Sequence, residues 1–186
     1  MIGFAMCGSF CTHAAALNVL SQLTEKYDVL PILSFASATT DTRFGKAADL
    51  TARLTAMTGH APIITIADAE PLGPACPLDA LVVCPCTGNT LSKLASAITD
   101  TPVTMACKAH QRCDRTLLIA LASNDAMAGN LSNIGTLLCR KNVYFVPMRQ
   151  DDIVSKPHSL VADFTLVPKA LDAAMAGRQL RPLFLT

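Results

Sequence analysis

Short, mainly apolar runs recur along the chain, and each is followed by polar residues, a glycine or a proline. Runs of this length, without strict alternation of apolar and polar residues, predict short strands that are buried on both faces, as in a parallel sheet. These runs cover residues 1–6, 28–33, 78–84, 117–121 and 143–146, and a shorter one covers residues 62–66.

Amphipathic stretches separate these runs and predict helices. They cover residues 12–27, 42–57, 90–98 and 163–176, and a further helix is expected after Asn124. Strands that alternate with helices predict an α/β fold, a three-layer αβα sandwich around a parallel, doubly wound sheet. We find no internal repeat and no linker, so residues 1–186 are expected to form a single domain.

The composition narrows the class of protein. Hydrophobic residues make up 51% of the chain and charged residues 16%, which suits a buried parallel sheet and predicts that part of the surface is covered in a homo-oligomer. The net charge is +1 and no basic run occurs, so a nucleic-acid partner is not expected.

The uncharged N-terminal stretch raises the question of a signal peptide or membrane anchor. A signal peptide needs an early positive region, whereas the first cation is Lys26. Polar residues such as Ser9, His13 and Asn18 interrupt the apolar stretch that a membrane span would need. We therefore expect a cytoplasmic protein.

Eight cysteines lack the paired spacing of a zinc site, and the chain lacks the small, loop-rich character of a disulfide scaffold. The nearest pairs are Cys7 with Cys11 and Cys84 with Cys86. We expect most of the cysteines to be buried free thiols and no metal to be bound, with Cys11 and Cys86 set apart by their position in loops.

Small polar residues follow four of the predicted strands. Because ligands of open parallel sheets bind beyond the carboxyl ends of the strands, these residues predict the binding site. Hydroxyls, glycines and amides at helix N-termini suit a phosphate monoester, although each alone is also an ordinary helix cap. Neither G-x-G-x-x-G nor a P-loop motif is present. The residues are Gly8, Ser9, Cys11 and Thr12, then Ser34, then Thr87, Gly88, Asn89 and Thr90, then Ser123 and Asn124.

Residues 85–95, PCTGNTLSKLA, resemble the Pro-x-Ser/Thr-x-Asn-Thr-x-x-Lys-x-Ala motif of the flavin-containing cysteine decarboxylase superfamily. Further stretches narrow the resemblance to one branch, the B subunits of dipicolinate synthase, over nearly the whole chain. They include TRFG at residues 42–45, AEPLGP at 69–74, SNDA at 123–126 and QDD at 150–152.

The resemblance implies a flavodoxin-like fold that binds FMN, and a homo-oligomer. It implies a nicotinamide-type A subunit as partner and a small dicarboxylate substrate, a dihydrodipicolinate-type precursor oxidised to pyridine-2,6-dicarboxylate during sporulation. By the same resemblance, Asn89 approaches the isoalloxazine, and Ser123 and Asn124 face flavin or substrate. The residues expected at the phosphate and ribityl chain are Gly8, Ser9, Cys11, Ser34, Thr87 and Thr90.

Two departures argue against cysteine decarboxylation. The family's catalytic His is replaced by a stretch that begins with Glu70, and glycines do not flank Cys139. For the substrate we single out Arg43 as a carboxylate ligand and Glu70 as an acid or base. The alternatives are an FMN-dependent decarboxylase, an FMN-modifying enzyme resembling the prenyltransferases of the superfamily, and a non-catalytic scaffold subunit.

Overall fold

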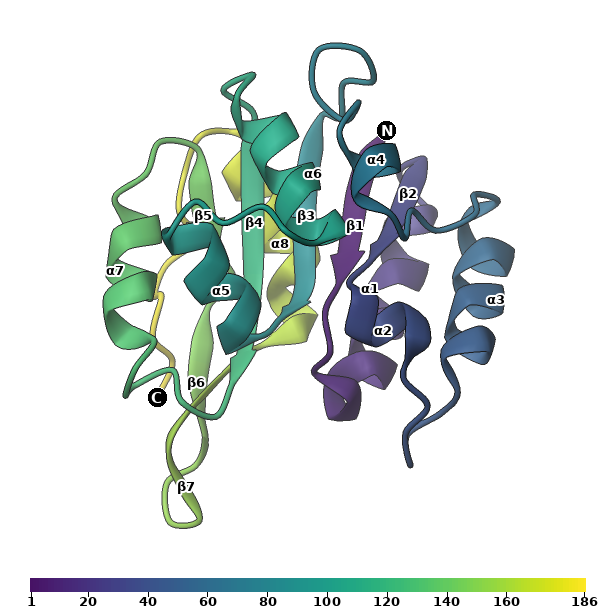
Figure 1. Ribbon diagram of the computed structural model, residues 1–186. Coiled ribbons are helices and arrows are strands. Elements are labelled where there is room, and N and C mark those ends of the chain that lie inside the picture. Colours follow the sequence, from purple (N-terminus) through teal and green to yellow (C-terminus); the bar gives the residue numbers. More distant parts are fainter.

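The computed structural model covers residues 1–186 and has a seven-stranded sheet with helices on both faces (Figure 1). The strand order is β2-β1-β3-β4-β7-β6, and β5 also pairs with β4. The strands are β1 (Ile2–Met6), β2 (Val29–Leu33), β3 (Ala80–Cys86), β4 (Thr116–Ser123), β5 (Val143–Phe145), β6 (Met148–Asp152) and β7 (Lys156–Ala162).

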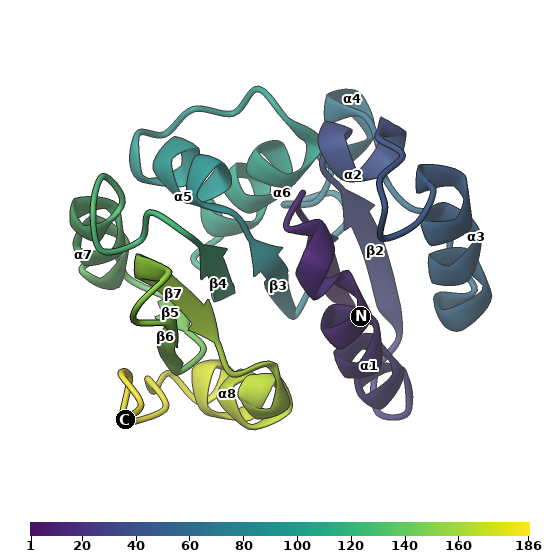
Figure 2. The same cartoon turned by 90° about the horizontal axis from the view of Figure 1, so that it is seen from below.

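The helices divide between two layers, as Figure 2 shows along the sheet. One core cluster joins the sheet to α1, α3 and α8, and the other joins it to α4, α5, α6 and α7. The prediction of a three-layer sandwich is confirmed. The helices are α1 (His13–Thr24), α2 (Phe35–Thr39), α3 (Ala47–Thr58), α4 (Ile66–Ala69), α5 (Gly88–Ala95), α6 (Pro102–Gln111), α7 (Leu131–Leu138) and α8 (Val167–Met175), with short 3-10 turns η1 (Phe10–Thr12) and η2 (Phe164–Leu166).

The five strands predicted from the main apolar runs are parallel, as expected. The sheet is mixed, however, because β6 and β7 form an antiparallel hairpin, and β7 pairs with the last residues of β4. No apolar run announced this hairpin, since most of β6 and the first residues of β7 are exposed. In Figure 1 the hairpin projects beyond the body of the protein.

Local differences from the predicted elements have local causes. Residues 62–66 contribute one bridge, from Ile63 to Ile32, instead of a strand, because Thr65 caps α4 with its side chain. The polar stretch after β2 contains α2, which Ser34 caps by accepting a hydrogen bond from the Ser37 amide. Residues 42–45 form a turn, so α3 begins at Ala47 instead of Thr42; it ends at Thr58 and is capped by Gly59, whose φ is 75°.

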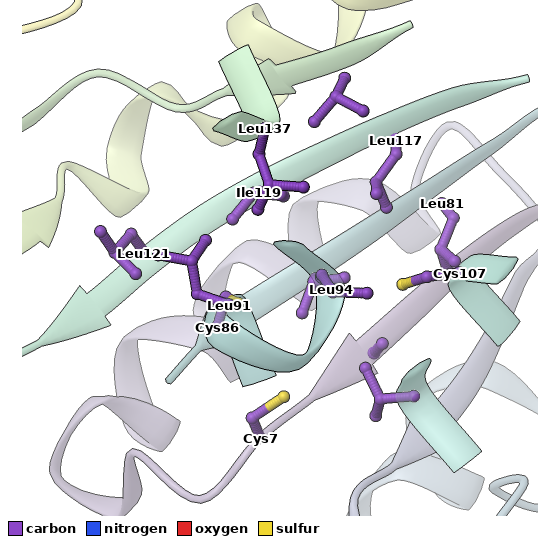
Figure 3. Packing of buried hydrophobic residues seen from close by; sticks show 14 of the residues in the cluster. Cys7, Leu81, Cys86, Leu91, Leu94, Cys107, Leu117, Ile119, Leu121 and Leu137 are labelled. Carbon is purple, nitrogen blue, oxygen red and sulfur yellow. The ribbon is translucent and has the colours of Figure 1, made fainter. Parts of the chain in front are cut away.

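All eight cysteines are free, as expected, but only half of them are buried. The expectation that most of them are buried is therefore wrong. Cys86 lies inside β3 and not in a loop. Burial raises the pKa of the Cys7 thiol to about 11. Figure 3 shows Cys7, Cys86 and Cys107 among leucines of the core. These buried thiols act as small apolar side chains.

No helix is both long and apolar enough to cross a membrane.

The burial of His110 leads us to expect a lower free energy of unfolding in mild acid. The residue is fully buried, its Nε2 donates to the Thr116 carbonyl oxygen at 2.8 Å, and its Nδ1 has no partner. Burial lowers the pKa of His110, so below about pH 6.5 the unfolded chain takes up a proton that the folded chain refuses. The free energy of unfolding is therefore expected to fall with pH, by up to about 1.4 kcal/mol per unit for one such group.

Urea unfolding at pH 7.5, 6.5 and 5.5 measures this slope. His110→Gln keeps an N–H donor and cannot titrate, so its slope is expected to be shallower. His13 has a pKa lowered by burial and contributes in the same direction in both proteins. Equal slopes in the two proteins would contradict the prediction.

Candidate functional site

A cleft of about 880 Å³ opens where β1, β3 and β4 end. Its volume lies within the range of roughly 300–1,000 Å³ that is usual for small-molecule sites. Its walls come from four segments, the loop after β1 with η1, the start of α5, the end of β4, and the hairpin of β6 and β7, and Phe44 of the turn at residues 42–45 also reaches it. The lining residues are Gly8, Ser9, Phe10, Cys11, Thr12, Phe44, Thr87, Gly88, Asn89, Ala122, Ser123, Asn124, Asp125, Asp151, Lys156, Ser159 and Val161.

The loop after β1 is held by short hydrogen bonds. The Ser9 amide donates to the Cys7 carbonyl at 2.8 Å, and Thr12 Oγ1 donates to the Ser9 carbonyl at 2.8 Å. His13 Nε2 donates to the Cys7 carbonyl at 2.9 Å. A Cβ on Gly8 would lie 3.3 Å from the Cβ of Ala36, so the backbone passes close to α2. The loop therefore presents a fixed backbone to the cleft.

The start of α5 forms the second wall. Thr87 is the N-cap, and its Oγ1 accepts from the Thr90 amide at 3.3 Å. Backbone N–H groups of a first helical turn lack partners within the helix and favour an anion. Gly88 and the exposed Asn89 follow on the cleft wall. This wall offers backbone N–H groups, a hydroxyl and a carboxamide.

The end of β4 carries a network around Asp125. Its carboxylate accepts hydrogen bonds from Ser123 Oγ and, at 2.9 Å, from Asn130 Nδ2. Asn130 Oδ1 accepts from Ser92 Oγ at 2.7 Å, which ties the network to α5. Because Ser123 donates its hydroxyl hydrogen to Asp125, Ser123 Oγ can only accept from a ligand. This wall therefore favours an N–H or O–H donor.

Gly88 fits against this network with no room for a side chain. A Cβ there would lie 2.5 Å from Ser123 Oγ, 2.6 Å from Asp125 Oδ1 and 2.7 Å from Asn130 Nδ2. The absence of a side chain thus lets α5 approach the end of β4 and joins two walls of the cleft.

The hairpin supplies the fourth wall. Lys156 Nζ lies 2.6 Å from Asp151 Oδ2 across the two strands, and both residues line the cleft. Lys156 is the only cation among the lining residues, which also include the carboxylates of Asp125 and Asp151. The cleft contains no histidine.

Seven of the nine residues predicted to bind the cofactor line the cleft, and the exceptions are Ser34 and Thr90. Both are buried and already engaged: Ser34 caps α2, and Thr90 Oγ1 donates to Cys7 Sγ at 3.3 Å. They therefore stabilise the elements around the cleft without lining it. The seven are Gly8, Ser9, Cys11, Thr87, Asn89, Ser123 and Asn124.

The two residues predicted to act on the substrate lie outside the cleft. Arg43 is exposed and stacks over the ring of Phe44 at 4.8 Å, and only Phe44 reaches the cleft. Glu70 follows α4 and lies 3.3 Å from Arg112 at the end of α6. Figure 1 places α4 near the N-terminus, where β1 begins, at the opposite edge of the sheet. The structure therefore places the predicted acid or base, Glu70, away from the cleft.

Sequence reasoning missed the charged residues of the cleft, Asp125, Asp151 and Lys156. Asp125 directly follows the predicted strand end at Ser123 and Asn124, so its position was a usable signal. Asp151 and Lys156 lie beyond the apolar runs, and only the pairing of β6 with β7 brings them together.

A family model described as Flavoprotein matches residues 2–157. The B subunit of dipicolinate synthase from Bacillus subtilis (strain 168) is 42% identical over 183 residues, which are 98% of this chain and 92% of that protein. The crystal structure of the corresponding B subunit from Bacillus halodurans C has a TM-score of 0.91 at 37% identity, over 100% of this chain and 95% of that one. An FMN-dependent cysteine decarboxylase structure has a TM-score of 0.67 at 23% identity over 94% of each chain, a likeness of fold.

Proposed function

Because the chain belongs to the Flavoprotein family, we propose that it binds FMN in the cleft and serves as the flavoprotein subunit of a dipicolinate synthase. One observation carries the proposal. The loop after β1, the start of α5 and the end of β4, where the cofactor-binding residues are predicted, line one cleft in a chain 42% identical to such a subunit. Its substrate would be a dihydrodipicolinate-type ring, oxidised to pyridine-2,6-dicarboxylate.

The donors of the cleft fit the polar groups of FMN. The phosphate would meet the backbone of Gly8 and Ser9 and the N-terminus of α5 at Thr87, where anions are favoured. Asn89 and Asn124, both exposed on the wall, offer carboxamides to the polar edge of the ring system. A bound flavin supplies two-electron redox chemistry, and the protein supplies binding and orientation.

Asp125 takes the place that sequence analysis gave to Glu70. Oxidation of a dihydropyridine to a pyridine removes a hydride equivalent and a proton, so a proton acceptor beside the ring is required. Asp125 is a carboxylate on the cleft wall, fixed by Ser123 and Asn130. We assign to its carboxylate the acceptance of the ring proton.

The same resemblance leads us to propose a nicotinamide-type A subunit as partner, assembly as a homo-oligomer, and the cytoplasm of a sporulating cell as the setting. The alternative of FMN-dependent cysteine decarboxylation has support from fold likeness at 23% identity. The absence of a histidine from the cleft weighs against it, because the decarboxylases that the chain resembles use a catalytic His.

The experiment is an absorbance spectrum of the purified chain followed by titration with FMN. We expect a flavin spectrum or saturable binding, weakened about five- to tenfold in Asn89→Ala, since one well-placed ligand hydrogen bond contributes about 1–1.5 kcal/mol. Asn18→Ala, an exposed position on α1 away from the cleft, is the control. Failure of the wild-type chain to bind FMN would overturn the proposal and favour a scaffold subunit.

A further inference from the structure

We propose that Lys156 is the carboxylate-recognition residue of this protein and that the hairpin of β6 and β7 selects a small planar ring carrying carboxylates. The inference rests on the proposed function and names the recognition element of that site. The sequence predicted Arg43 as the carboxylate ligand, but its guanidinium does not line the cleft. We place this role on Lys156 of β7 instead.

The charge balance of the cleft carries the argument. Its walls contain two carboxylates, Asp125 and Asp151, and a single cation, Lys156. Among these charged side chains, a dicarboxylate entering the cleft is repelled by the first two and attracted by the third. Burying a carboxylate without a partner is costly, so the ligand's anionic edge is directed to Lys156.

The geometry leaves Lys156 available. Its Nζ lies 2.6 Å from Asp151 Oδ2, while 53% of its side chain remains exposed. An ammonium group has three donors, and one is used by Asp151, so two remain for a ligand carboxylate. The hydrogen bond that Lys156 donates to Asp151 raises the pKa of the lysine, which keeps the amine charged.

The hairpin faces the rest of the site. Lys156 and Ser159, both on β7, line the cleft together with Cys11 from the loop after β1 and Asp125 from the end of β4. A ring bound between these walls would place one carboxylate on Lys156.

The test uses calorimetric titration of the FMN-loaded chain with pyridine-2,6-dicarboxylate and with pyridine, which lacks carboxylates. We expect Lys156→Met to weaken the dicarboxylate about tenfold or more, as loss of a charge-assisted hydrogen bond predicts, while FMN affinity changes less than about twofold. Lys141→Met is the matched control, since Lys141 makes a comparable exposed ion pair, 2.8 Å from Asp114, outside the cleft. Lys156→Arg is expected to recover most of the affinity.

Three outcomes would overturn the assignment. Unchanged dicarboxylate affinity in Lys156→Met, or equal binding of pyridine and the dicarboxylate by the wild-type chain, removes carboxylate recognition from Lys156. A loss of FMN affinity in Lys156→Met would mean that the lysine binds the cofactor phosphate instead. Failure of the wild-type chain to bind FMN would remove the proposed function, and titration of the flavin-free chain with the dicarboxylate would still decide whether Lys156 binds carboxylates.

Discussion

Gly88→Ala is expected to weaken FMN binding by at least about tenfold and to lower the free energy of unfolding by about 1–3 kcal/mol. A Cβ at this position would lie within 2.5–2.7 Å of Ser123 Oγ, Asp125 Oδ1 and Asn130 Nδ2. These atoms belong to one hydrogen-bonded network, so they cannot yield separately. Relief of the overlap requires these side chains to turn away, which breaks the network, or the start of α5 to move away from the end of β4; either change disturbs the junction of two walls of the cleft.

Gly135→Ala provides the control for this prediction. Gly135 lies within α7, and a Cβ there would meet nothing within 4 Å. Alanine in a helix interior is favoured over glycine by roughly 0.5–1 kcal/mol, so this variant is expected to be slightly more stable and to bind FMN normally. FMN titration and urea unfolding of both variants check the pair. Normal flavin affinity in Gly88→Ala would contradict the fit of α5 against β4.

Leu91→Ala is expected to cost about 2–5 kcal/mol of unfolding free energy. Leu91 is fully buried, and Figure 3 shows its side chain pointing from α5 toward the sheet, near Cys86 and Leu121. Its removal leaves a cavity beneath the helix that carries Thr87 and Asn89. We therefore expect weaker FMN binding in addition to lower stability, because the wall of the cleft loses its support.

Leu131→Ala is the control, because it removes the same side-chain atoms from an exposed leucine instead of a buried one. Leu131 is the first residue of α7 and is 50% exposed, so its truncation is expected to change stability by less than about 0.5 kcal/mol. Urea unfolding of the two variants in parallel gives the difference. A similar cost for both would contradict the packing of α5 on the sheet.

The sequence by itself determined the parallel part of the sheet and the edge at which the predicted cofactor-binding residues gather. The apolar runs that form β1, β2, β3, β4 and β5 are buried on both faces. A strand of this kind is apolar at nearly every position, so the sequence alone predicts it. Parallel strands end at one edge of the sheet, so polar residues after β1, β3 and β4 had to meet there. This is why Ser9, Thr87 and Ser123, which come from three separate segments, line the same cleft.

The tertiary structure alone decided which polar residues face the cleft and where its charges lie. Ser34 and Thr90 follow strands as Ser9 does, but packing directs their hydroxyls away from the cleft. The Ser34 hydroxyl caps α2, and the Thr90 hydroxyl donates to Cys7 Sγ. Glu70 lies at the other edge of the sheet because the loop after α4 packs on α6. Lys156 and Asp151 meet only through the pairing of two exposed strands, which no apolar pattern records. Strand burial is a property of the local sequence, whereas contacts between distant polar segments depend on the order and direction in which the strands assemble.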